Sequence, residues 1–125
     1  MFRHLLAVPV VSAALLASLS LLPLAQAEET GEASAAGLAA VSELGQLNGL
    51  ALACAQPALV TRARGMVIDL APKTRRYGEA FESATSQSFI VQGQGETPCP
   101  DGKTLAERLD QAARQLKAAF PKRNS

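Results

Sequence analysis

The sequence predicts an all-α protein: a small antiparallel bundle of about four helices, clipped by one disulfide. Three observations lead to this prediction. Apolar residues recur at spacings of three and four along four segments, and no segment reads as a strand. Short connections join the segments, so neighbouring helices should run antiparallel. The chain has only two cysteines, Cys54 and Cys99. We therefore expect a single helical domain over residues 35–121.

Residues 1–27 have the features of a secretory signal peptide. Arg3 precedes a charge-free apolar stretch over residues 5–22, and Pro23 and the small-residue pattern Ala25-Gln-Ala27 follow. The alternative is a retained membrane anchor, since roughly 18 to 20 apolar residues can span a bilayer. The proline and the small residues favour cleavage after Ala27. We therefore expect an exported protein, periplasmic or extracellular, that touches the membrane only through its signal peptide before cleavage.

The composition of the mature chain excludes several functions. Removing 27 of the 125 residues leaves 98, enough for one small domain. The only histidine, His4, and one of the 12 basic residues, Arg3, leave with the signal peptide, so 11 basic residues face 11 acidic ones. This balance argues against nucleic acid as a partner. Without an imidazole, Ser-His and Cys-His catalysis and the commonest transition-metal ligand are lost. We expect no enzyme, no cofactor and no metal site.

The two cysteines predict one disulfide, because the compartment of an exported chain is oxidising. A bond between Cys54 and Cys99 closes a loop of about 45 residues, which in the chain-entropy model stabilises the fold by about 4 kcal/mol. Two free thiols or an intermolecular bridge are the alternatives. The intramolecular bond would tie the end of the first helix to the loop before the last one.

The first helix should cover residues 35–54, after a flexible acidic lead-in over 28–34. Its apolar stripe consists of Leu38, Val41, Leu44, Leu47, Ala51 and Cys54. Beside the stripe runs a small-residue ridge at four-residue spacing, formed by Gly37, Val41, Gly45, Gly49 and Ala53. Such a ridge lets another helix approach closely. The alternative for this segment is a turn at Asn48-Gly49.

The second helix should begin at Pro57, which suits a first helical turn, and end before Pro72. Its apolar face consists of Leu59, Val60, Ala63, Met66, Val67 and Leu70. The third helix should run from Arg75, capped by Thr74, to about Gln92. It carries three of the four mature aromatic residues, which either fill the core or line a ligand pocket: Tyr77, Phe81 and Phe89.

The fourth helix has the clearest pattern. Thr104 to Glu107 reads as a capping box, although Asp101 is placed to cap an earlier start. We expect Asp110 and Arg114 to form an exposed pair one turn apart. A polar tail follows over 122–125. The apolar stripe of this helix consists of Leu105, Leu109, Ala112, Leu116 and Phe120.

The one charge feature with a functional interpretation is a basic patch on the second helix and the turn after it. Such a patch can meet an acidic partner or anionic headgroups. The alternative is a solvated surface offset by nearby carboxylates, namely Asp69, Glu79 and Glu82. The patch consists of Arg62, Arg64, Lys73, Arg75 and Arg76.

In outline, a small exported helical chain with one long-range disulfide is similar to the periplasmic acid-stress chaperones. The resemblance is one of size and architecture. The residues around Cys54 lack the tryptophan and acidic residues found near that family's first cysteine: they are Ala53, Ala55, Gln56 and Pro57. No residue or activity is therefore carried over. We predict a protein that binds another envelope or secreted protein, with a stress chaperone or holdase as the alternative.

The exported protein should begin at Glu28 and carry no free thiol. Intact mass spectrometry after alkylation, without prior reduction, tests both points. A mass that retains residues 1–27, or one that includes two alkylated cysteines, would contradict the prediction.

Overall fold

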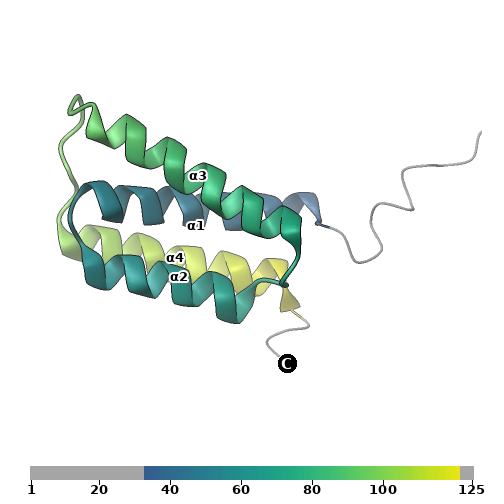
Figure 1. Cartoon of the computed structure of the whole chain (residues 1–125). Helices are drawn as coiled ribbons and strands as arrows, with labels where there is room; N and C mark the ends of the chain where they lie inside the picture. The colour runs from purple at the N-terminus through teal and green to yellow at the C-terminus, as the bar shows by residue number, and fades with distance from the viewer. Residues whose placement is uncertain (1–32, 122–125) are drawn as a thin grey trace, which may run out of the picture.

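The computed structural model describes residues 33–121, which form four α-helices and no strand. In chain order these are α1 (Ala35–Ala53), α2 (Pro57–Leu70), α3 (Arg75–Gly93) and α4 (Gly102–Ala119). α1 packs against all three other helices, and α2 also contacts α4. α3 lies along α1 (Figure 1) and packs almost entirely on it. The all-α bundle clipped by a disulfide is thus confirmed.

The predicted signal peptide over 1–27, most of the lead-in over 28–34 and the polar tail over 122–125 lie outside the described residues. At the boundary, Ser34 is the N-cap of α1, and its side chain accepts a hydrogen bond from the Gly37 N–H at 3.0 Å. The Ser34 N–H in turn donates to the hydroxyl oxygen of Tyr77 at 2.9 Å. The entry to α1 is therefore fixed against α3.

The other helix starts follow from local sequence. Thr74 caps α3, accepting from the Tyr77 N–H, and α2 begins at Pro57. α4 begins earlier than the Thr104 box predicts, because Asp101 is its N-cap and accepts from the Thr104 N–H at 2.7 Å. The hydrogen bond from the Thr104 backbone lowers the pKa of the Asp101 carboxyl below its ordinary value.

The core lies between α1 and α4, with α2 closing one side. The stripe predicted for α4 is buried along its whole length, and five of the six largest fully buried side chains are aliphatic. They are Val41 and Leu44 from α1 and Leu105, Leu109 and Leu116 from α4. α2 contributes only one fully buried residue, Ala63; its larger apolar residues are half-buried, except Ile68, which is exposed. α2 is therefore the least covered of the four helices.

The small-residue ridge of α1 is where α3 packs, as predicted. A Cβ atom on Gly45 would lie 2.6 Å from the carbonyl oxygen of Phe81, and one on Gly49 would overlap the backbone of Thr85 and Phe89. Because these neighbours are backbone atoms, no side-chain rotation relieves the overlap. The alternative of a turn at Asn48-Gly49 is wrong, since α1 continues without interruption to Ala53.

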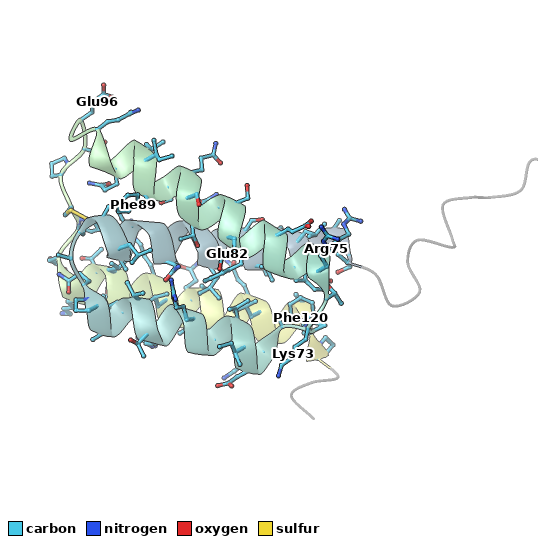
Figure 2. All side chains as sticks on the ribbon, viewed as in Figure 1. Lys73, Arg75, Glu82, Phe89, Glu96 and Phe120 are labelled. Atoms are coloured by element: carbon cyan, nitrogen blue, oxygen red, sulfur yellow. A yellow bond between two sulfur atoms is a disulfide. The ribbon has the colours of Figure 1, made fainter. Side chains whose placement is uncertain are left out.

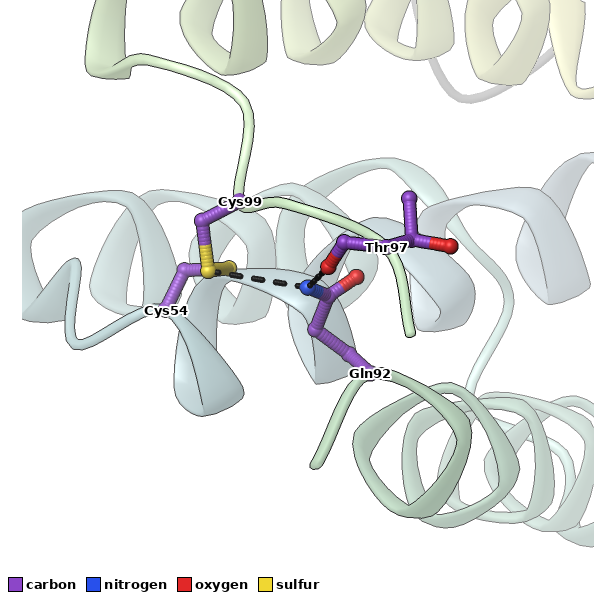
Figure 3. Close-up of a disulfide and its surroundings, with 4 residues drawn as sticks. All are labelled: Cys54, Gln92, Thr97 and Cys99. Atoms are coloured by element: carbon purple, nitrogen blue, oxygen red, sulfur yellow. Dashed lines mark hydrogen bonds between the residues drawn. A yellow bond between two sulfur atoms is a disulfide. The ribbon is translucent and has the colours of Figure 1, made fainter. Parts of the chain in front are cut away.

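The predicted disulfide joins Cys54, at the end of α1, to Cys99 in the loop before α4, with their Cα atoms 5.7 Å apart. The last turn of α3 contributes to this corner (Figure 3). The side-chain amide of Gln92 donates to the Thr97 carbonyl oxygen at 2.7 Å and lies 3.6 Å from the Cys99 sulfur. The loop between α3 and α4 is thus held to the ends of both α1 and α3.

Two glycine substitutions test the close approach of α1 and α3. Gly49→Ala should lower the free energy of unfolding by about 2 kcal/mol or more, because the added methyl group would overlap the α3 backbone and no side-chain rotation relieves the overlap. Gly65→Ala, in α2, is the matched control because nothing lies within 4 Å of its added Cβ. It should raise stability by roughly 0.5 to 1 kcal/mol through helix propensity alone. Urea denaturation measures both, and a Gly49→Ala variant as stable as the parent would contradict the packing.

Candidate functional site

The five residues of the basic patch do not form one surface. Arg62 turns away from the others toward α4, where its guanidinium forms an ion pair with Asp110 and donates to the Ala106 carbonyl oxygen at 3.4 Å. The predicted pair between Asp110 and Arg114 is therefore wrong: Asp110 takes its partner from α2. Arg62 links two helices of the bundle.

Of the other four basic residues, Arg64 and Lys73 line the side of the molecule where α2 and α3 face each other. Lys73, Arg75 and Arg76 are exposed around the α2–α3 turn, whereas Arg64 lies farther along α2. Figure 2 shows Lys73 and Arg75 at the turn end of the helices. Arg75 forms an ion pair with Glu79, one turn on, at 2.7 Å, and its side chain is 90% exposed.

A groove runs between α2 and α3, because α3 packs on α1 and leaves the facing side of α2 uncovered. It consists of three successive open hollows of about 410, 340 and 450 Å³. The first two share Val67, Ile68 and Gly78, and the last two share Arg64 and Glu82, so the hollows are continuous. We call this surface the α2–α3 groove.

The lining of the groove changes along its length. Its turn end is formed by the α2–α3 connection and includes Lys73 and the largely buried Tyr77. In the middle, Arg64 on α2 and Glu82 on α3 line opposite walls. The far end, toward the disulfide, is lined by Arg64 and Glu82 where it joins the middle, by the hydroxyl-bearing Thr85 and Ser86, and by three large apolar side chains: Leu52, Phe89 and Ile90.

Large apolar side chains are exposed in this groove rather than scattered over the molecule. Among the described residues the exposed large hydrophobics are five, and four of them line the groove. Ile68 is 57% exposed and Ile90 61%. The fifth, Val91, directly follows Ile90 on α3. Contiguous exposed apolar side chains of this kind are typical of the interaction sites of proteins.

The three aromatic residues of α3 differ in burial: two of them fill the core, and the third lines the groove. Tyr77 and Phe81 are buried, and the Tyr77 ring meets that of Phe120 edge-on at a centroid distance of 5.1 Å. Phe89 is 48% exposed and lies toward the far end of the groove (Figure 2). Phe89 and Ile90 lie on a part of α3 that no other helix covers.

A buried polar pair beside the groove was missed by the sequence reasoning. Asn48, fully buried on α1, donates from its side-chain amide to the Thr85 hydroxyl at 3.1 Å. Its carbonyl oxygen has no hydrogen-bond partner among the described residues. A buried polar atom without a partner costs roughly 1 to 3 kcal/mol. The only sequence signal was a polar residue inside the small-residue ridge, next to Gly49.

The groove offers apolar surface, the cations of Lys73 and Arg64, the carboxylate of Glu82 and the hydroxyl groups of Thr85 and Ser86. Within residues 33–121 no three metal-ligating side chains gather into a cluster. Over the same range, no helix has both the length and the apolar character needed to cross a membrane.

The chain matches no family model, no curated protein sequence and no solved structure. The groove and its lining are therefore the observations on which a functional proposal can rest.

Proposed function

We propose that this is an exported protein that binds a segment of another periplasmic or secreted protein in the α2–α3 groove. The observation that carries the proposal is the alignment of Leu52, Ile68, Phe89 and Ile90 along one continuous hollow. Burying apolar surface contributes about 25 cal/mol per Å². A partner that covers these side chains would gain this energy at one site.

The scaffold around the groove is suited to binding without rearrangement. α1 packs against all three other helices, α3 among them, and the disulfide holds the end of α1 to the loop before α4. A site whose walls are already in place loses little conformational entropy when it binds. This supports a binding protein that meets its partner in the conformation seen here.

Export is part of the proposal. The signal-peptide pattern over residues 1–27 predicts it, and the disulfide between Cys54 and Cys99 is compatible with an oxidising compartment. A partner in the same compartment would meet the α2–α3 groove directly.

The structure offers no specific support for an acid-triggered chaperone, the alternative from the sequence. Acid lowers stability through carboxylates that the folded state holds ionised. Within residues 33–121 the carboxyl whose pKa is clearly lowered is that of Asp101, the exposed N-cap of α4. The buried polar side chains within residues 33–121 are Asn48 and Thr85, and neither titrates. A holdase that binds unfolded clients in the open groove at constant pH is a separate alternative, and the following experiment distinguishes it from the proposed function.

Site-specific photo-crosslinking in the source cells tests the proposed function. A photoreactive benzoylphenylalanine at Ile68 or Ile90 should give one discrete adduct with another exported protein. The same residue at Gln111, exposed on α4, is the control and should give none. Once mass spectrometry identifies the partner, Phe89→Asp should weaken its binding to the purified chain.

The outcomes are distinct. A ladder of many unrelated adducts from Ile68 and Ile90 would favour the holdase. No adduct at either position, or the same adducts from Gln111, would contradict binding in the groove.

A further inference from the structure

We propose that the segment bound in the α2–α3 groove is an amphipathic helix of about four turns, with acidic residues at the end that lies over the α2–α3 turn. This inference rests on the proposed function and adds the conformation, length and charge pattern of the bound segment.

The walls of the groove favour a helix as the occupant. They are two antiparallel helices standing on a third, and a further helix between them would complete the layer that α2 and α3 leave open. An extended segment would bind by adding to the edge of a sheet, but residues 33–121 contain no strand. The main-chain groups of an extended segment would therefore find no ladder to join.

The length of the groove sets the length of the occupant. Its lining on α3 extends from Tyr77 to Ile90, a distance of about 20 Å at about 1.5 Å per residue. A helix of about four turns spans this distance and presents apolar residues at spacings of three and four. Ile68 would meet its apolar stripe in the middle of the groove, and Phe89 and Ile90 at the far end.

The charge of the groove is asymmetric along its length. At the turn end Lys73 is exposed and lines the hollow. No ion pair joins Lys73 to another described residue, and the nearby Arg75 is paired with Glu79. Asp69 does not line the hollows. The turn end thus offers a partner one unpaired cation.

The rest of the groove provides no comparable charge. Arg64 and Glu82 line opposite walls in the middle and offset each other. Beyond them the far end is lined by apolar side chains and two hydroxyl groups. Complementary charge therefore selects a helix that is acidic at one end and apolar along its stripe, and places the acidic end over Lys73.

Synthetic helical peptides test the inference with the full oxidised chain. The probes are peptides of about 16 residues, long enough for the four turns, built from alanine, glutamine and a leucine stripe. One pair carries three glutamates in the first turn or in the last turn, and its matched pair carries lysines there instead. Fluorescence anisotropy gives each dissociation constant at low and at high salt.

The better glutamate peptide should bind about two- to fivefold more tightly than its lysine twin, since one exposed charge pair contributes modestly. High salt should reduce this preference. Lys73→Glu should abolish or reverse it. Lys103→Glu, an equal charge change on an exposed residue of α4, should leave it intact. Ile68→Asp should weaken every peptide.

Equal affinity for the glutamate and lysine peptides would overturn the acidic-end inference, and if Ile68→Asp still abolished binding the proposed groove function would stand. Failure of all four peptides to bind saturably would also overturn the inference. Binding that Ile68→Asp leaves unchanged would contradict the groove itself. A dimer that sedimentation detects and that Ile68→Asp dissociates, with all peptides excluded, would make a second copy the occupant and overturn the inference.

Discussion

The fold depends on how closely α3 approaches α1. Gly45 and Gly49 place the α1 backbone against the α3 backbone at a separation that no Cβ atom would allow. α3 therefore lies on α1 rather than between α1 and α2, and the facing side of α2 stays open. The groove is thus a consequence of the packing, because the glycines that bring α3 close to α1 also keep α3 away from α2. The cost of interior glycine in a helix, about 1 kcal/mol each relative to alanine, is offset by this contact.

The disulfide acts on the same arrangement from the opposite end. Chain connectivity joins α2 and α3 at the turn, where the groove is bounded by Lys73 and Tyr77. At the far end the corner formed by Cys54, Cys99 and the Gln92 side chain holds the ends of α1 and α3 and the start of the α4 loop. The exposed Phe89 and Ile90 lie on the last turns of α3 before this corner. Both ends of the groove are therefore anchored, while its length remains uncovered.

Much of the architecture was predictable because it is local or set by one pair of residues. Apolar periodicity gave the four helices, proline and threonine gave the starts of α2 and α3, and the cysteine count gave the disulfide. The small-residue ridge indicated a close neighbour for α1. The site was less predictable. Periodicity shows that Phe89 and Ile90 lie on an apolar face, but only the packing shows that nothing covers that face. Charge spacing within α4 suggested Arg114 as the partner of Asp110, whereas the arrangement of α2 beside α4 supplies Arg62 instead. Cross-helix partners, including Asn48 with Thr85, depend on tertiary position and leave no pattern in one segment.

The central claim is that the glycines of α1 hold α3 in backbone contact and so leave the groove open. Nuclear Overhauser spectroscopy of the free oxidised protein tests it most directly. The account predicts strong effects from the α protons of Gly45 to the methyl group of Ala84 and from those of Gly49 to the β protons of Ser88. Glycine α protons that show effects only within their own helix, with Ala84 and Ser88 instead contacting α2, would contradict it.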